Sequence, residues 1–323
     1  MTPSEPASSL RHLVSISHLS TPEFKSLVNR AEYHKKLIKS GEQITSQPLQ
    51  GKTIALLFTK RSTRTRVSTE GAAVYFGAHP MFLGKDDIQL GVNESLHDTT
   101  KIISSMTSCI FARVNQHSDI QELCKYSSVP IVNALCDTYH PLQAICDLLT
   151  IKETFHDNLE NLKLAWIGDA NNVINDLSIA ALRMGINVAI ATPQGVEIAD
   201  HIRAKAAEVS KETGAKIELT HDPKVAATGA NILVTDTFVS MGEESQKAEK
   251  LAKFKGFQIN SELGALAAPN WKFMHCLPRH KEEVSDDVFY GDHSIVFPEG
   301  ENRLYAAIAT VEAFVVNKGK FVI

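Results

Sequence analysis

A chain of 323 residues with 43% hydrophobic residues is long enough for two domains of ordinary size, each with its own core. The formal net charge of −4 gives no electrostatic reason to expect nucleic acid or a membrane surface as a partner, and no apolar run approaches the roughly 18 residues of a membrane span. The five cysteines are odd in number and lack CxxC spacing, which favours free thiols in a reducing compartment.

Residues 1–9 are rich in Ser and Pro and predict a frayed N-terminal arm. They include an acidic residue, no arginine and no apolar core, so the pattern fits neither a secretory signal nor an Arg-rich transit peptide. The sequence therefore predicts a cytoplasmic protein. The alternative is a mitochondrial matrix protein whose transit peptide is missing from this sequence.

Strands and helices alternate from Thr53 to the end of the chain. Expected strands are residues 53–58, 79–83, 109–114 and 129–133, then 162–167, 187–191, 216–220, 232–235, 273–276 and 294–297. Expected helices include residues 141–155 as a bridge, 196–213, and about 301–316 at the end. This alternation predicts an α/β fold of two doubly wound parallel-sheet domains joined by helices. We place the domains at residues 1–145 and 146–300, with residues 301–323 packing back on the first domain.

The first polar cluster follows the first strand, where the sequence from Lys60 to Arg66 reads Lys-Arg-Ser-Thr-Arg-Thr-Arg. A helix that starts there presents unpaired backbone N–H groups and the positive end of its dipole, which together attract an anion. Ser62, Thr63 and Thr65 add hydroxyl donors, and Arg64 can fork two N–H bonds onto a phosphate. We predict a phosphate site here; a solvated basic helix start is the weaker interpretation at the carboxyl end of a buried strand.

Two further polar groups belong to the same sheet edge. Arg113 ends the third expected strand, and His140 starts the bridging helix with Gln143 three residues on. Taken singly, Arg113 could be a surface charge and His140 with Gln143 a capping pair. Because the carboxyl ends of parallel strands meet at one edge, we expect all three to converge on the anion.

The expected strands of the second series are followed by side chains of a different kind. Residues 164–172 contain Gly168 but not the GxGxxG spacing, which argues against a dinucleotide site. Asp236 ends a strand where a carboxylate suits an ammonium group, although a capping role is equally compatible. Cys276 ends another strand, where a small buried hydrophobe is the common role of cysteine. There is no HExxH and no paired cysteine, so we expect no metal.

Four motifs occur in an order that resembles a known family: Ser-Thr-Arg-Thr-Arg at 62–66, His-Pro-x-Gln at 140–143, Asp-x-x-x-Ser-Met-Gly at 236–242 and His-Cys-Leu-Pro-Arg at 275–279. They resemble those of the aspartate/ornithine transcarbamoylase superfamily, and the last two resemble its ornithine branch in the fungal form. The similarity spans about residues 10–318. It implies transfer of the carbamoyl group of carbamoyl phosphate to the δ-amine of L-ornithine, giving L-citrulline and phosphate in arginine biosynthesis or the urea cycle, with no cofactor and in a homotrimer.

The resemblance also implies roles for residues at the matching positions. For carbamoyl phosphate these are Ser62, Thr63, Arg64, Thr65, Gln89, Arg113, His140, Gln143, Cys276, Leu277 and Arg303, with Gln89 reaching in from a neighbouring subunit. For L-ornithine they are Asn172, Asp236, Ser240 and Met241. Arg113, His140 and Cys276 are the expected catalytic residues.

The reaction needs a neutral δ-amine, whose reference pKa of about 10.4 keeps it mostly protonated at neutral pH. We expect Asp236 to anchor the α-ammonium, and Cys276, as thiolate or hydrogen-bond acceptor, to assist deprotonation of the δ-nitrogen. The loop of residues 236–244 is expected to close over ornithine. Open alternatives are another acceptor such as aspartate, putrescine or acetylated ornithine, a non-catalytic phosphate-binding protein and, more distantly, a Rossmann oxidoreductase.

Overall fold

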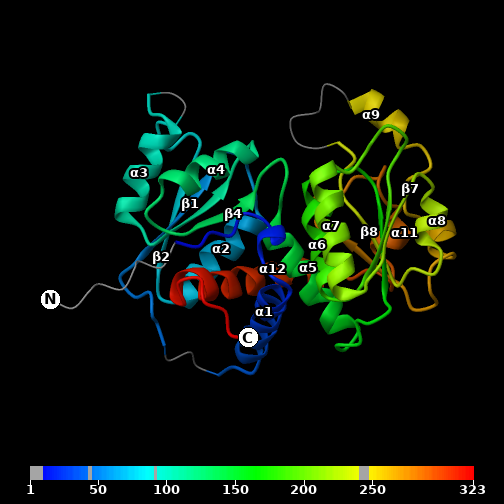
Figure 1. Ribbon diagram of the computed structural model, residues 1–323, viewed down its shortest axis with the longest axis horizontal. Helices are drawn as coiled ribbons and strands as arrows, with labels where there is room; N and C mark the ends of the chain where they lie inside the picture. The colour runs from blue at the N-terminus through cyan, green and yellow to red at the C-terminus, as the bar shows by residue number, and fades with distance from the viewer. Residues whose placement is uncertain (1–9, 43–45, 91–92, 240–246) are drawn as a thin grey trace.

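The structure is a computed structural model that describes residues 10–42, 46–90, 93–239 and 247–323. Two α/β domains lie side by side, each built on a parallel sheet (Figure 1). The first sheet has the order β2-β1-β3-β4 and the second has the order β7-β6-β5-β8-β9. The predicted fold, two doubly wound parallel-sheet domains joined by helices, is confirmed.

The first domain alternates strands and helices after an N-terminal helix. Its elements are η1 (Ile16–His18), α1 (Thr21–Lys39), β1 (Thr53–Phe58), α2 (Arg64–Tyr75), β2 (His79–Gly84), α3 (Leu96–Met106), β3 (Cys109–Arg113), α4 (His117–Tyr126) and β4 (Ile131–Leu135). A capping box starts α1, because the Ser20 side chain accepts from Glu23 N and Glu23 accepts from Ser20 N. Five of the six residues of β1 are buried, as expected of a central parallel strand covered on both faces.

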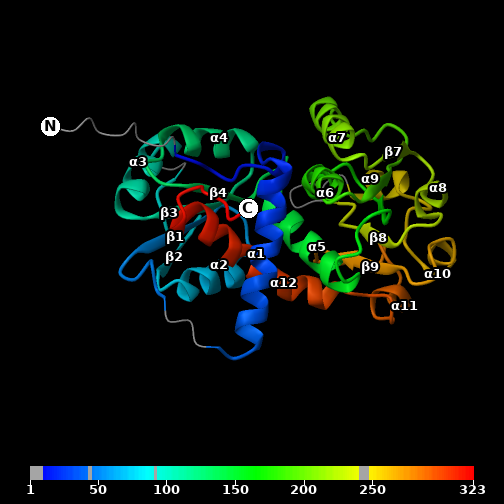
Figure 2. The ribbon, with the colours of Figure 1, turned by 60° about the horizontal axis from the view of Figure 1, so that its bottom comes forward.

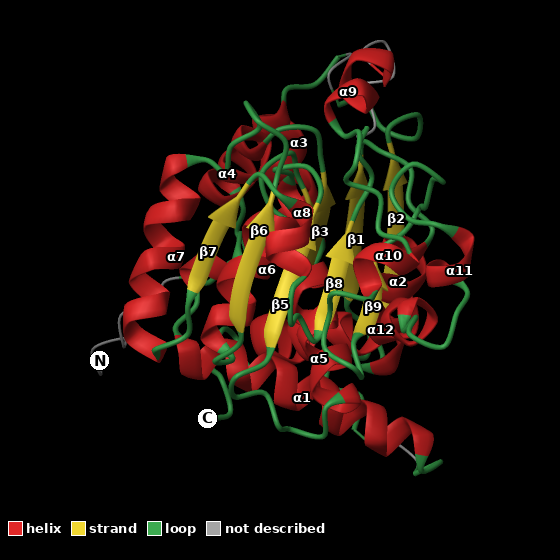
Figure 3. Cartoon of the chain, turned by 90° about the vertical axis from the view of Figure 1, so that its right-hand side faces the viewer, coloured by secondary structure: helices red, strands yellow, loops and turns green. Residues whose placement is uncertain are grey.

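The second domain follows α5 (Pro141–Thr154). Its elements are β5 (Lys163–Ile167), α6 (Asn172–Arg183), β6 (Asn187–Ala191), α7 (Asp200–Thr213), β7 (Ile217–Thr220), α8 (Pro223–Ala227), β8 (Ile232–Thr235), α9 (Lys247–Lys253), α10 (Ser261–Gly264), β9 (Lys272–His275) and α11 (Asp286–Phe289). Figure 3 shows the arrows of this sheet running in one direction, so their carboxyl ends share one edge.

Three expected elements differ from the structure. Residues 294–297 are not a strand: Ser294 makes one isolated bridge to Phe273, and α12 (Val296–Val311) begins two residues later. Pro298 falls in the first turn of α12, where its missing N–H leaves no helical bond unmade, so an apolar segment that resembled a strand starts a helix. β4 lies two residues later than expected, after Pro130, and α7 begins at Asp200 rather than at residue 196.

The last helix ties the domains together. α12 packs against α1 and α2 of the first domain, against the bridging α5, and against β9 of the second sheet. Figure 2 shows α1, α5 and α12 between the two sheets. A π-helical turn (Glu312–Val316) then ends the helix. The limits at residues 145 and 300 stay a prediction, since one buried cluster runs from β1 through α5 and α12 to β5. No helix in the described ranges is long and apolar enough to cross a membrane.

Candidate active site

A cavity of about 780 Å³ lies between the carboxyl ends of the two sheets. It is lined by the β1–α2 turn, by the residues that follow β4, β5, β8 and β9, and by Arg303 of α12. The structure brings most of the predicted site residues to this cavity: Ser62, Thr63, Arg64, Thr65, Arg113, His140, Gln143, Asn172, Asp236, Cys276, Leu277 and Arg303.

Among the residues that the structure describes, Gln89 is the predicted site residue that is not brought there. Gln89 is exposed, does not line the cavity of its own chain, and its Oε1 accepts a hydrogen bond of 2.7 Å from Asn93 Nδ2. Ser240 and Met241 lie outside the described residues, as does most of the loop expected to close over ornithine.

One end of the cavity is built to receive an anion. The α2 N-terminus points into it, and Arg64, Arg113 and Arg303 converge from α2, β3 and α12. Arg113 Nε, Arg303 Nε and Arg303 Nη1 are buried without a hydrogen-bond partner among the described residues. Because a buried guanidinium without acceptors is unfavourable, these donors indicate a ligand with several anionic oxygens.

The electrostatics agree with this geometry. Burial and the charges of Arg303 and Arg64 lower the pKa of Arg113 to about 10. Burial, followed by the charges of Arg303, Arg113 and Arg64, holds the pKa of His140 well below its ordinary value. His140 is therefore a neutral imidazole, and its Nδ1 has no partner in the described part of the chain. A neutral imidazole can donate a hydrogen bond from its N–H to a substrate oxygen without adding positive charge to the site.

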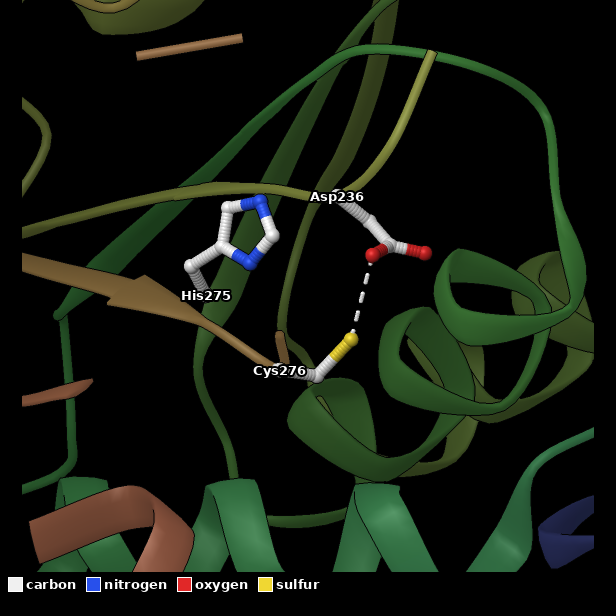
Figure 4. Close-up of side chains that lie close together, drawn as sticks. All are labelled: Asp236, His275 and Cys276. Carbon is white, nitrogen blue, oxygen red and sulfur yellow. Dashed lines mark hydrogen bonds between the residues drawn. The ribbon is translucent and has the colours of Figure 1, made fainter. Parts of the chain in front are cut away.

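The other end of the cavity carries a carboxylate and a thiol. Cys276 Sγ donates to Asp236 Oδ1 at 3.2 Å, the contact drawn in Figure 4, and Asn171 Nδ2 donates to Asp236 Oδ2 at 2.9 Å. Burial and the nearby charges of Asp236 and Glu299 raise the pKa of Cys276 well above its usual range. The thiol is therefore neutral, so the structure gives no support to a resting thiolate.

The Asp236, His275 and Cys276 side chains form the one group of three potential metal ligands found within the described ranges, with donor atoms within 4.8 Å of one another. Both ring nitrogens of His275 are engaged, because Nδ1 accepts from Leu277 N at 2.9 Å and Nε2 lies 3.1 Å from Glu283 Oε2. The group is thus a hydrogen-bonded network that holds the end of β9.

A hydrogen bond links the anion end of the cavity to the residues that follow β9 of the second sheet. Arg64 Nη2 donates to the backbone oxygen of Leu277 at 2.5 Å. Leu277 has φ of 61°, a left-handed conformation that is uncommon for a residue with a Cβ, and such residues gather at functional sites. The Leu277 carbonyl is thereby turned toward the first domain.

Sequence reasoning missed several buried acids beside the site. Asp147 and Glu299 lie behind Gln143 and accept hydrogen bonds from it, and Asp176 accepts the backbone N–H of His140 at 2.8 Å. Asp147 gave a usable signal, since an acid four residues after Gln143 in a helix that is buried along most of its length requires a partner. Glu299 gave no such signal in the sequence, because its partner Gln143 is distant in the chain.

The fold and this cavity define a class: two-domain α/β enzymes that hold a small anionic substrate between the carboxyl ends of two parallel sheets. A family model of the carbamoyl-phosphate-binding domain of aspartate/ornithine carbamoyltransferase matches residues 11–153, and a model of its aspartate/ornithine-binding domain matches residues 160–314. The chain belongs to the aspartate/ornithine carbamoyltransferase family.

Individual relatives agree with the family assignment. The chain is 67% identical over 313 residues to an ornithine transcarbamylase, mitochondrial, of Pachysolen tannophilus, covering 96% of this chain and 90% of the relative. It is 64% identical to the ornithine carbamoyltransferase of Saccharomyces cerevisiae, covering 97% and 96%. The crystal structure of a mitochondrial ornithine carbamoyltransferase from Coccidioides immitis superposes with a TM-score of 0.91 at 56% identity, over 97% of this chain and all of that one.

Proposed function

We propose that the protein is an ornithine carbamoyltransferase that transfers the carbamoyl group of carbamoyl phosphate to the δ-amine of L-ornithine. One observation carries the proposal: a single cavity has three convergent arginines at one end, two of which have unpaired donors, and the Asp236 carboxylate at the other. A phosphorylated donor fits the first end and a cationic amine fits the second. The names of the relatives support the same substrates.

The chemistry follows from the positions of these groups. The neutral δ-nitrogen attacks the carbonyl carbon, a C–N bond forms, and the bond from carbon to the phosphate oxygen breaks with its electron pair leaving on phosphate. Arg64, Arg113 and His140 stabilise the negative charge that develops on the carbonyl and phosphate oxygens. Arg303 and the α2 N-terminus hold the phosphate. The nitrogen loses one proton during the transfer, and the Asp236 carboxylate, which already accepts a hydrogen bond from the Cys276 thiol, is the group at this end that can receive it.

The proposal is tested by measuring phosphate release and the carbamoylated product from carbamoyl phosphate with L-ornithine, putrescine and L-aspartate in parallel. We expect turnover with L-ornithine and at least a hundredfold less with the other two, since L-aspartate brings a second carboxylate to Asp236 and putrescine has no α-carboxylate. Turnover with L-aspartate or putrescine alone would reassign the acceptor. No product with any of the three would contradict the proposed activity.

We also propose that the chain assembles as a homotrimer in which Gln89 reaches the cavity of a neighbour. Gln89 is exposed and does not line the cavity of its own chain, and β2 is an edge strand in the described part of the first sheet. The helices that precede and follow that strand in the chain carry exposed apolar side chains, among them Val67 and Val74 on α2 and Ile102 and Met106 on α3. Sedimentation should give three times the chain mass of 35.5 kDa, and a monomer at micromolar concentration would contradict it.

The names of the relatives give partly different indications of the cellular compartment. Two relatives at 67% and 58% identity are named mitochondrial, whereas the Saccharomyces cerevisiae relative carries no such word. The names therefore favour the mitochondrial alternative over the cytoplasmic expectation. Fractionation of cells that express the natural protein would decide between the two compartments.

A further inference from the structure

Two buried carboxyl groups lie directly behind Gln143, on the side away from the cavity. The side chains of Asp147 on α5 and Glu299 on α12 come from opposite sides and are hydrogen-bonded to each other. Asp147 and Glu299 are each 2% exposed, so water does not compete for them. Neither residue touches the cavity.

Both carboxyls accept hydrogen bonds from the same amide. Gln143 Nε2 donates to Asp147 Oδ1 at 2.7 Å and to Glu299 Oε1 at 3.1 Å. An amide nitrogen has two hydrogens, so this pair uses both. The amide oxygen has no donor among the described residues, and Gln143 lines the cavity. The oxygen is therefore the polar atom that Gln143 has left to offer a ligand.

The protonation of the pair preserves this arrangement. Burial raises the pKa of Asp147 to about 7, and burial with the charge of Asp147 raises the pKa of Glu299 well above its ordinary value. Above neutral pH the pair thus holds one proton between its members, and an oxygen of each remains an acceptor for Gln143. Glu299 is also fixed from behind, because its Oε2 accepts the backbone N–H of His275 at 3.0 Å.

We propose that Asp147 and Glu299 are positioning residues that fix the orientation of the Gln143 amide, so that its oxygen selects a phosphorylated substrate bearing an NH₂ group over one bearing a methyl group. An amide oxygen accepts a hydrogen bond from an NH₂ group and can make none with a methyl group. A free amide could rotate and offer either end. This inference rests on the proposed function, because it identifies what holds the carbamoyl end of the site.

Two substitutions separate orientation from charge. Both Asp147→Asn and Glu299→Gln replace an acid by the amide of the same shape. In the Asp147→Asn variant the introduced amide can keep its oxygen toward Gln143 and donate its NH₂ to Glu299, which preserves the orientation. In the Glu299→Gln variant the fixed N–H of His275 retains the amide oxygen, so the new NH₂ faces Gln143 and turns that amide around.

The measurement is calorimetric binding of two stable analogues that differ in this one group, phosphonoacetamide with NH₂ and acetonylphosphonate with methyl. Wild type should prefer phosphonoacetamide. Glu299→Gln should lower that preference about tenfold, and Asp147→Asn should keep it within about twofold, whatever happens to the separate affinities. If both variants lost the preference for phosphonoacetamide equally, or both kept it equally, the inference would be overturned. A role of the two acids in packing or charge alone would affect both variants alike.

The same titrations tell the two proposals apart. Wild type that binds neither analogue would overturn the proposed function and this inference with it, whereas wild type that binds both analogues equally overturns the inference alone. If Glu299→Gln does not fold, neutron diffraction from deuterium-exchanged wild-type crystals reads the orientation directly. We expect the two deuterons on Gln143 Nε2 to point toward the carboxyl groups of Asp147 and Glu299. Deuterons that point into the cavity would overturn the inference.

Discussion

At the scale of single residues, Asp236 makes one end of the cavity chemically different from the other. It is buried and held from two sides by Cys276 and Asn171, while the arginines gather at the opposite end of the cavity. Burial raises the pKa of Asp236 above its ordinary value, which an incoming ammonium group would reverse. A carboxylate in this position contributes most when a cation binds beside it.

We therefore expect Asp236→Asn to raise the KM for L-ornithine about tenfold to a hundredfold, because a charge-assisted hydrogen bond of about 1.5–3 kcal/mol is lost. The KM for carbamoyl phosphate should change by less than about threefold. Steady-state kinetics with each substrate varied in turn measures the two constants. Asn171→Ala serves as the matched control, since it removes a support of Asp236 and leaves the carboxylate. An unchanged KM for L-ornithine would show that Asp236 does not hold the amine.

At the scale of elements, the π-helical turn that ends α12 is joined to α1 by a half-buried ion pair. Arg30 donates to Glu312 Oε2 from Nε at 2.7 Å and to Oε1 from Nη2 at 2.6 Å, and His34 Nε2 lies 3.1 Å from Glu312 Oε2. Burial would raise the pKa of Glu312, but the hydrogen bonds from His34 and Arg30 outweigh it and hold the pKa at about 2. The contact matters to the site because α12 also carries Arg303.

A carboxyl with a lowered pKa stabilises the folded state above its unfolded pKa, and this contribution is lost as pH falls toward the folded value. Glu312→Gln should therefore lower the free energy of unfolding by about 1–2 kcal/mol at pH 7, after allowance for partial exposure to solvent. The difference from wild type should narrow below about pH 4.5 and vanish toward pH 2. Urea unfolding at pH 7, 5 and 3.5 measures it. A difference that stays constant over this range would rule out the charge of Glu312 as its source.

At the scale of the whole molecule, the cavity joins two domains that meet along α5 and α12. The unpaired donors of Arg113 and Arg303 come from β3 and α12, and Arg64 reaches across to Leu277 of the second domain. An anion bound here would join Arg113 of the first domain to Arg303 of α12, the helix that packs against both domains. Ligand binding should thus stabilise the two domains together.

We expect phosphonoacetamide at about a hundred times its dissociation constant to stabilise the protein by about 2.7 kcal/mol, seen as a single thermal transition at a higher temperature. Scanning calorimetry with and without the analogue measures the shift. Arg303→Ala, which removes two of the unpaired donors, should abolish most of it. Separate transitions, with the second domain unaffected by the ligand, would contradict the bridging role.

The sequence predicted local features well where neighbouring residues decide them. The β1 strand, the α2 start and the polar residues between them are contiguous, so apolar pattern, hydroxyls and arginines were all visible in residues 53–66. The strand predicted at residues 294–297 was wrong, because a short apolar run fits a strand and a helix start equally well. Here the tertiary contacts of α12 favour the helix.

The sequence by itself determined the alternation that makes two parallel sheets, and hence that Arg113 and His140 share the edge of the first sheet while Asp236 lies at the edge of the second, because strand direction follows from the connections. Only the tertiary structure decided which buried acids support these residues. Glu299 meets Asp147 and Gln143 across more than 150 residues of chain, and its raised pKa comes from burial among them. Burial and pairing at that distance depend on packing, which no local pattern encodes.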